Sequence, residues 1–224
     1  MESTAGVSAF STLAGFNVCT YAGAADVDAD LRRLEALTGV GREFMRFPVQ
    51  THSTRVVCVD ADARVDLRGV DGVVTADARL LIGVHTADCL PLLLADVDAG
   101  IVGAVHCGWR GIVGGIVGNA LDAMAAAGAR RLVAAMGPCI CAGCFEVGPE
   151  VADRFDPDAV IGGTGGARPR VDLARAVALQ LRRGGVDRIE LPPACSKCSP
   201  GLYSVRRQGR ELPFRTLTAI KIKN

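Results

Sequence analysis

The sequence predicts an α/β fold, in the broad sense that includes α+β arrangements, with one domain over residues 1–224. Short apolar runs of the length of buried strands alternate with stretches in which apolar residues recur at helical spacing. Half of the 224 residues are hydrophobic and 22% are charged, which is enough to bury a large core. No internal repeat or low-complexity linker divides the chain, so we expect a single ordered domain.

The expected elements follow from local patterns. Short apolar or β-branched runs predict strands at Phe10 and at 55–60, 71–75, 80–84, 90–95, 101–106, 132–136, 189–191, 202–204 and 217–222. Apolar residues at helical spacing predict helices over 27–37, 112–127 and 171–183, and Pro149 suits the first turn of a short helix. The stretch 112–127 contains Gly114, Gly115 and Gly118, which are poor helix formers. The glycine- and proline-rich stretch 161–169 predicts a loop.

The composition argues against nucleic-acid and membrane partners. The formal net charge of +1 gives no general attraction to nucleic acid or acidic membranes. Aromatic residues, at 4%, are too scarce for a base-stacking platform. The N-terminus has neither a basic start nor an apolar run, and no apolar segment is long enough to cross a bilayer. We therefore expect a cytoplasmic protein; its oligomeric state is not predicted.

The runs 90–95 and 101–106 are expected to pair as an antiparallel hairpin. The link between them, Asp96-Val-Asp-Ala-Gly100, predicts a turn. It is too short for the crossover connection that parallel strands require. A turn centred on Val97 and Asp98 places Cys89 opposite His106, and the loop type allows a shift of about two residues. Either register brings Cys89 and His106 together at the open end of the hairpin, as two metal ligands or as a Cys–His catalytic pair.

Two imidazoles and one thiolate suggest a metal centre. His52, Cys89 and His106 fit a catalytic zinc site, in which three protein ligands leave a fourth position open. The alternative is a surface histidine, a buried thiol and a core histidine without a metal, and the spacing alone leaves both interpretations open. His85, the third histidine of the chain, is expected to be a satisfied strand residue rather than a fourth ligand.

Other polar residues are candidates for binding and catalysis. Arg110 and Gly111 stand where a helix is expected to start, so backbone N–H groups and a guanidinium could bind an anion there; the alternative is an exposed turn. Arg206 could bind phosphate or belong to a solvated surface. Asp88 could act as a catalytic carboxylate or cap a turn, because on a regular strand it would point away from Cys89.

The chain has nine cysteines. An odd number without a signal peptide favours free thiols over disulfides. Cys195 and Cys198 have the spacing of a zinc knuckle. Cys139, Cys141 and Cys144 form a C-x-C-x-x-C cluster in a Gly-Pro turn, and this cluster is not taken to repeat that spacing. Free thiols are the favoured interpretation, and a second metal site is the alternative.

Several catalytic classes lack their signatures. The sequence contains no H-E-x-x-H motif, no H-x-E motif of cytidine-type deaminases, no Walker loop, no G-x-G-x-x-G and no G-x-S-x-G.

With these residues, the chain resembles the laccase-domain or polyphenol-oxidase-like family, which includes purine nucleoside phosphorylases of that type and proteins like the peptidoglycan editing factor. The matching pieces are Phe10-Ser11, Gln50-Thr-His52, Asp71-Gly72, Thr86-Ala-Asp-Cys-Leu-Pro91, Ala104-Val-His-Cys-Gly-Trp-Arg-Gly111, Gly137-Pro138, Phe145-Glu-Val-Gly148 and Tyr203-Ser-Val-Arg-Arg207. The chain departs from the family at Cys107, where alanine is usual, and in the segments 15–23 and 208–215.

The resemblance implies a layered sandwich of mixed β-sheets flanked by helices, similar to the cysteine-hydrolase-like fold. It implies one zinc ion on His52, Cys89 and His106. It also implies phosphorolysis of adenosine, inosine and methylthioadenosine to free base and sugar 1-phosphate, with adenosine deamination as a side activity. The substrates would then be purine nucleosides and phosphate.

A mechanistic hypothesis assigns roles to the remaining site residues. Cys89 and His106 would be catalytic as well as ligands, and Arg110, Gly111 and Arg206 would bind phosphate. Gln50 and Glu146 would contribute to substrate binding, and Asp88 or Glu146 would move protons. Three alternatives stay open. They are a hydrolase or amidase with Cys89 activated by His106, as in cell-wall precursor editing; a copper-dependent polyphenol oxidase; and a zinc-stabilised binding module without turnover.

Overall fold

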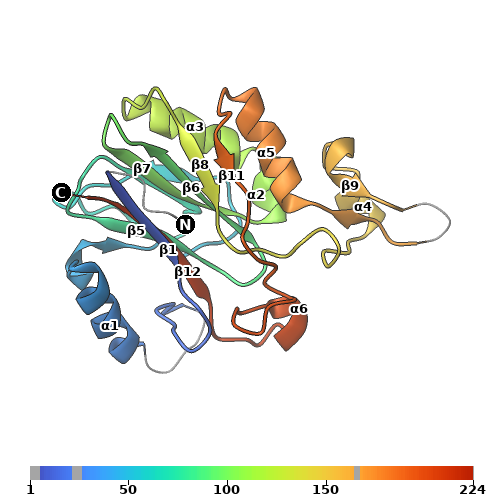
Figure 1. Cartoon of the computed structure of the whole chain (residues 1–224), viewed down its shortest axis with the longest axis horizontal. Coiled ribbons are helices and arrows are strands. Elements are labelled where there is room, and N and C mark those ends of the chain that lie inside the picture. Colours follow the sequence, from blue (N-terminus) through green and yellow to red (C-terminus); the bar gives the residue numbers. More distant parts are fainter. Residues whose placement is uncertain (1–5, 22–26, 164–166, 224) are drawn as a thin grey trace.

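Two β-sheets packed face to face form the centre of the molecule, and helices cover both outer faces (Figure 1). The structure, a computed structural model, describes residues 6–21, 27–163 and 167–223. The strands are β1 (Val7–Ser11), β2 (Met45–Arg46), β3 (Val56–Cys58), β4 (Gly72–Thr75), β5 (Leu81–Thr86), β6 (Leu90–Asp96), β7 (Ile101–Cys107), β8 (Val133–Met136), β9 (Val160–Ile161), β10 (Arg170–Val171), β11 (Ile189–Glu190) and β12 (Thr216–Ile222).

The helices lie mostly outside the sheets. They are α1 (Asp28–Thr38), α2 (Trp109–Gly114), α3 (Ile116–Ala126), α4 (Pro149–Ala152), α5 (Leu173–Arg183) and α6 (Val205–Gln208), with 3-10 turns η1 (Arg42–Phe44) and η2 (Pro157–Ala159). Helices α2, α3 and α5 cover the outer face of one sheet, and α1 lies against the other (Figure 1). None of the described helices is long and apolar enough to cross a membrane.

Both sheets are mixed. The six-stranded sheet has the order β11-β8-β6-β7-β4-β3, and the four-stranded sheet has the order β1-β12-β5-β2. The pairs β3–β4, β8–β11 and β2–β5 are parallel, and the other pairs in these two sheets are antiparallel. A separate pair, β9–β10, projects to the side (Figure 1). The predicted sandwich of mixed sheets flanked by helices is confirmed.

The central hairpin β6–β7 is buried on both faces. Every residue of both strands is buried, because one face packs on the helices and the other on the four-stranded sheet. Leu90 pairs with Cys107 and Pro91 with His106. The predicted register, from a turn centred on Val97 and Asp98, pairs His106 with Cys89. The observed register is shifted by two residues, which lies within the predicted range. Cys89, immediately before β6, therefore stays at the open end beside His106.

Two local expectations differ from the structure. The single helix expected over 112–127 is divided, because Gly115 has a φ of +95° that ends α2 and turns the chain into α3. The strand expected over 202–204 is absent. Instead, the hydroxyl of Ser204 accepts a hydrogen bond from the backbone N–H of Arg207 at 3.2 Å and caps the start of α6.

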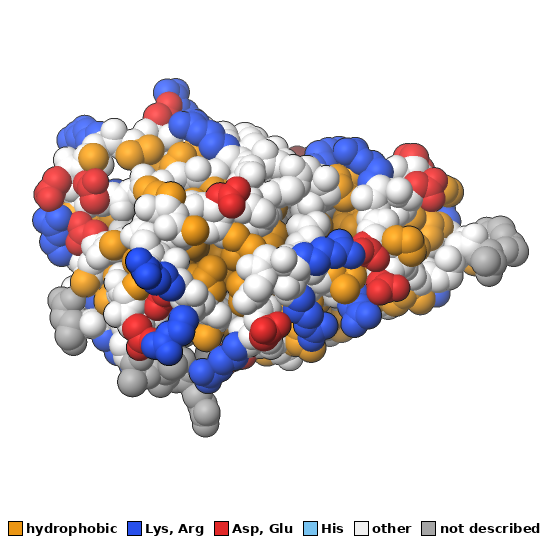
Figure 2. Space-filling model, turned by 90° about the horizontal axis from the view of Figure 1, so that it is seen from above, with side chains coloured by type: hydrophobic (Ala, Val, Ile, Leu, Met, Phe, Trp, Pro, Cys, Tyr) orange, Lys and Arg blue, Asp and Glu red, His pale blue; other side chains and the backbone are white. Residues whose placement is uncertain are grey.

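The surface carries mixed charges. On the face seen in Figure 2, Lys and Arg side chains alternate with Asp and Glu side chains, and hydrophobic side chains lie between them. This pattern agrees with the near-neutral charge of the sequence.

Candidate metal centre

Three elements bring two imidazoles and a thiol together. His106 lies on β7, Cys89 precedes β6, and His52 lies in the loop between β2 and β3. One ligand atom from each of the three residues lies within 4.8 Å of the others. Sγ of Cys89 is 3.6 Å from Nε2 of His52, and the two imidazole centroids are 4.8 Å apart with their planes at 72°. His106 is buried whereas His52 is exposed, so the group opens to solvent on one side.

Asp71 positions both histidines. Its Oδ1 lies 2.7 Å from Nδ1 of His106, and the His106 backbone N–H donates to the Asp71 carbonyl. The same carboxylate accepts hydrogen bonds from the backbone N–H groups of residues 51–53 at 2.9–3.0 Å. Because Nδ1 of His106 is held in this way, Nε2 is the ring atom left to bind a metal ion. In the sequence, Asp71 stands out only as part of the family motif Asp71-Gly72, and no local pattern predicts this role.

The loop around His52 is strained and tightly packed. His52 has a φ of +62°, which non-glycine residues rarely adopt. The Asp71 hydrogen bonds hold that conformation. Gly108 closes the other side: a Cβ atom there would lie 2.6 Å from Cδ2 of His52 and 3.4 Å from Sγ of Cys89. A glycine is therefore required at this position for steric reasons.

The electrostatics favour the thiolate form of Cys89. Burial by itself raises the pKa of the thiol, but the charge of His106 and the hydrogen bonds from His106 and His52 lower the pKa to about 6. Burial likewise lowers the pKa of His106, whereas the Cys89 thiolate and Asp71 raise it to about 9. The thiolate is the form of cysteine that binds a metal ion. Two imidazoles, one thiolate and an open side match the donor set of a catalytic zinc site.

A pocket of about 510 Å³ is linked to the candidate metal centre through two of its lining residues: Trp109 follows Gly108, and the Arg206 backbone N–H donates to Asp88, which precedes Cys89. Its lining includes Trp109, Phe145, Glu146, Arg168 and Arg206. The Arg206 guanidinium carbon lies 5.1 Å from the centre of the Phe145 ring. A wider pocket of about 950 Å³ lies between β1 and α1 and contains none of the predicted site residues. We therefore associate the smaller, cationic pocket with the metal centre.

Only some of the residues predicted to bind phosphate lie near one another. Arg206 lines the pocket, and one of its guanidinium nitrogens donates to the Glu146 carbonyl at 3.1 Å. The Arg110 guanidinium carbon lies 4.6 Å from the centre of the Trp109 ring, at the edge of the same region. Gly111 is buried inside α2, a helix of only six residues.

Asp88 and Gln50 make structural contacts. The two Asp88 oxygens accept hydrogen bonds from the Ser196 hydroxyl at 2.6 Å and from the Arg206 backbone N–H at 2.7 Å. Asp88 has a φ of +99°, so it lies in a turn and not on a regular strand. The Gln50 amide exchanges two hydrogen bonds with the backbone of His85.

His85 is not part of the candidate metal-binding group. Its ring packs edge-on against Tyr21 and Phe47, and neither ring nitrogen has a hydrogen-bond partner. Burial, with smaller contributions from the positive charges of Arg215 and His106, lowers its pKa to about 3. His85 is thus a neutral core residue, but not a hydrogen-bonded one.

The fold and the site together define a class: an α/β sandwich with a histidine–cysteine group that could hold a metal ion at the open end of its central hairpin. Residues 2–223 match the family model described as multi-copper polyphenol oxidoreductase laccase. The chain belongs to this laccase-like, metal-binding family, as the sequence resemblance implied.

Relatives and solved structures support that assignment. A protein named adenosine deaminase RL5, from an unknown prokaryotic organism, is 38% identical over 98% of this chain and 95% of its own length. A purine nucleoside phosphorylase of Mycobacterium tuberculosis is 38% identical over 90% of this chain and 83% of its own. The crystal structure of YlmD from Geobacillus stearothermophilus has a TM-score of 0.89 at 28% identity, covering 98% of this chain and 93% of that chain.

Proposed function

We propose that this protein is a zinc-dependent purine nucleoside phosphorylase, acting on adenosine, inosine and methylthioadenosine, with adenosine deamination as a second activity. The observation that supports the proposal is the convergence of His52, Cys89 and His106, linked through Asp88 to Arg206 of a pocket lined by aromatic rings and arginines. The names of the relatives support the choice of purine nucleosides.

His52, Cys89 and His106 would hold the zinc ion. When bound, zinc supplies a Lewis acid that polarises an oxygen atom and lowers the pKa of water to about 7. Asp71 contributes by fixing the orientation of His106 and the backbone of the loop that carries His52. Copper is the alternative metal, which elemental analysis of the purified protein distinguishes from zinc.

Phosphorolysis places two demands on the pocket. A phosphate oxygen forms a bond to the sugar carbon C1′ while the bond from that carbon to the purine nitrogen breaks. The site must therefore bind a phosphate dianion and hold the base. We assign phosphate binding to Arg206 with help from Arg110, and contact with the base or sugar to Trp109 and Phe145.

The departing purine carries the bonding electron pair and needs a proton. Glu146 lines the pocket and its side chain is 54% exposed, near Arg168 at 3.9 Å. Asp88 is less suited to proton transfer, because both of its oxygens already accept hydrogen bonds. We therefore assign the proton transfer to Glu146 and a positioning role to Asp88.

The test is an assay of base release by protein whose metal content has been measured. Adenosine is supplied with and without phosphate, and adenine, ribose 1-phosphate and inosine are quantified for the wild type and for His106→Ala. Hypoxanthine is quantified as well, because inosine formed by deamination is itself a proposed substrate. We expect ribose 1-phosphate equal to the sum of adenine and hypoxanthine, only with phosphate, and none of these products from the variant. No base release from zinc-loaded protein, or release that does not require phosphate, would contradict the proposal.

A Cys–His hydrolase or amidase is the second candidate, and one observation favours it. The 3.6 Å separation of Cys89 Sγ from His52 Nε2 is also suitable for a nucleophile and its base. Iodoacetamide distinguishes the two functions. A metal-free enzyme that is active and is inactivated by alkylation of Cys89 would be a hydrolase, whereas the phosphorylase requires its metal.

A further inference from the structure

Four cysteines outside the metal centre converge at one place. Cys141 and Cys144 follow β8, and Cys195 and Cys198 follow β11. Their sulfur atoms all lie within 4.8 Å of one another. Sγ of Cys144 is 3.4 Å from Sγ of Cys198, and the backbone N–H of Cys141 donates to Sγ of Cys195 at 3.3 Å, across 54 sequence positions in each case.

The spacing of these sulfur atoms fits a tetrahedral metal ion. With Zn–S bonds of about 2.3 Å, four thiolates around one zinc ion stand about 3.8 Å apart. The observed 3.4 Å contact and the 4.8 Å upper limit lie on either side of that value. Each chain segment also supplies a C-x-x-C pair, since Cys141 and Cys144 repeat the spacing of Cys195 and Cys198 when Cys139 is set aside.

Backbone hydrogen bonds shape both cysteine turns. In the first turn, Cys144 N–H donates to the Cys141 carbonyl at 2.9 Å. In the second, Ser199 N–H donates to the Cys195 carbonyl at 3.0 Å. The Arg207 guanidinium donates to the carbonyls of Ser196, Lys197 and Ser199 at 2.8–2.9 Å and so holds the second turn from outside. The ligand-bearing turns are therefore formed by the protein itself.

The four cysteines lie at the solvent side of the hydrophobic core, against which Cys144 and Cys195 pack. Cys141 and Cys198 are exposed, and Cys144 and Cys195 are only half-buried. The two segments also have almost no regular secondary structure between β8 and α4 or between β11 and α6. A bound ion would add a cross-link between the two segments on the solvent side of the core.

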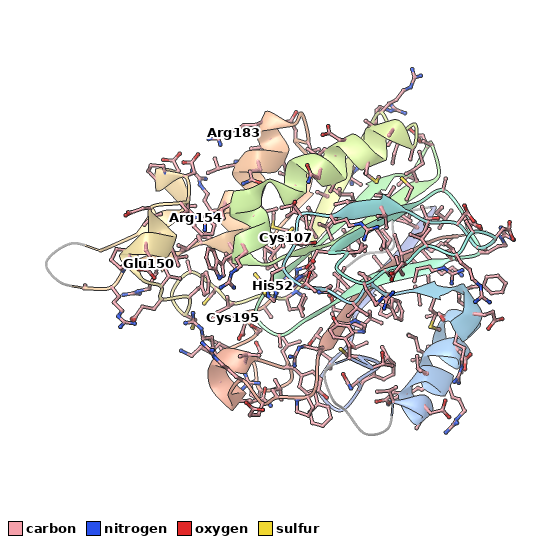
Figure 3. The ribbon with its side chains drawn as sticks, turned by 180° about the vertical axis from the view of Figure 1, so that it is seen from behind. His52, Cys107, Glu150, Arg154, Arg183 and Cys195 are labelled. Carbon is pink, nitrogen blue, oxygen red and sulfur yellow. The ribbon has the colours of Figure 1, made fainter. Side chains whose placement is uncertain are left out.

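We propose that Cys141, Cys144, Cys195 and Cys198 bind a structural zinc ion, separate from the His52–Cys89–His106 centre. Four thiolate ligands leave no open position, which is typical of structural and not of catalytic zinc. Figure 3 shows Cys195 and His52 in the same region of the molecule.

Residues next to the four cysteines also form hydrogen bonds to Asp88, beside the His52–Cys89–His106 centre. Ser196, next to Cys195, donates to the Asp88 carboxylate, and Ile140, next to Cys141, donates from its backbone N–H to the Asp88 carbonyl at 2.9 Å. Asp88 directly precedes Cys89. The structural ion would therefore hold the segments of Ile140 and Ser196 in place. Both segments bind Asp88, which precedes the proposed ligand Cys89.

Metal content tests this site independently of any enzymatic activity. Protein purified with zinc and a reductant is analysed for bound metals as the wild type, Cys89→Ser, the double variant Cys144→Ser/Cys198→Ser and the control Cys58→Ser. Cys58 is exposed on β3 and belongs to neither group. We expect two zinc ions per chain in the wild type and the control, and one in each of the other variants.

Cobalt substitution identifies the ligands. Thiolate-to-cobalt absorption should be strong in Cys89→Ser, which retains all four cysteines, and should be reduced to a weaker signal in the double variant. Thiols are also counted after denaturation in protein prepared without reductant, and all nine cysteines are expected to react as thiols.

In the metal analysis, absence of zinc from Cys89→Ser, or iron in the four-cysteine site, would contradict the proposal. In the thiol count, the loss of four thiols to two disulfides would contradict it. Failure of the double variant to fold leaves the Cys89→Ser measurement as the test. These results do not depend on whether the protein is a phosphorylase.

Discussion

Nδ1 of His106 lies 2.7 Å from Oδ1 of Asp71, and the same carboxylate caps the backbone N–H groups of residues 51–53. One buried side chain thus sets the orientation of one candidate ligand, His106, and the backbone conformation of the other, His52. The pairing of β4 with β7, in which Gly72 is opposite Val105, brings Asp71 beside His106.

Asp71→Asn should weaken metal binding. The amide cannot accept all the hydrogen bonds of the carboxylate, and loss of such a partner typically costs about 10–100-fold in metal affinity. Competition with a chelating indicator measures the zinc dissociation constant. The matched control is Asp96→Asn, because Asp96 is also buried and accepts backbone N–H groups, from Arg130 and Arg131, at the far end of the hairpin. Equal zinc affinity in the wild type and Asp71→Asn would refute the positioning role.

Gly108→Ala should also weaken metal binding. The φ and ψ of Gly108 suit alanine, but the new Cβ would lie 2.6 Å from His52, whose backbone is fixed by Asp71. The imidazole would have to move, so zinc content and activity should both fall. Gly118→Ala is the control, since nothing lies within 4 Å of its added Cβ in α3. That change should raise the free energy of unfolding by up to about 1 kcal/mol and leave zinc content unaltered.

His85 should make the protein less stable in acid. Its pKa is about 3 in the folded protein and near 6.5 in an unfolded chain. Between these values the unfolded chain binds more protons, so the free energy of unfolding should fall as the pH drops below about 6.5. The His85 contribution is about 1.4 kcal/mol per pH unit.

The variant His85→Gln isolates this contribution. Its side chain does not titrate, so its free energy of unfolding should depend less steeply on pH than that of the wild type between pH 6 and pH 4. Urea unfolding at several pH values provides the comparison. Parallel curves for the two proteins would show that His85 is protonated in the folded state.

Arg206→Ala should impair the use of phosphate. The proposed function assigns the phosphate to this guanidinium, and a hydrogen bond to a charged group contributes about 1.5–3 kcal/mol, so KM for phosphate should rise about 10–100-fold. The backbone N–H of residue 206 still donates to Asp88 in the variant. Arg32→Ala, at an exposed position on α1, is the control. An unchanged KM for phosphate in Arg206→Ala would remove Arg206 from the binding site.

The sequence predicted the features that depend on local patterns. The hairpin of 90–95 with 101–106 was predictable because an apolar run on each side of a five-residue Asp/Gly turn leaves few alternatives. That register in turn predicted the approach of Cys89 to His106. The position of His52 was not predictable from the hairpin, because its loop is held by a carboxylate 19 positions away.

Other features depend on contacts that a linear pattern does not contain. The break at Gly115 requires a left-handed residue, which glycine permits but does not impose. The convergence of Cys141 and Cys144 with Cys195 and Cys198 depends on the parallel pairing of β8 with β11. Two C-x-x-C spacings were the available signal, and including Cys139 in the first group concealed it.

Removal and return of the metal ion is the most direct test of the proposed zinc-dependent phosphorolysis. The protein is stripped with a chelator, confirmed by circular dichroism to remain folded, and assayed for ribose 1-phosphate formed from adenosine and phosphate before and after stoichiometric zinc is added. We predict loss of product on stripping and its recovery with zinc in the wild type, but not in His106→Ala. Undiminished ribose 1-phosphate formation by the metal-free protein would contradict the central claim.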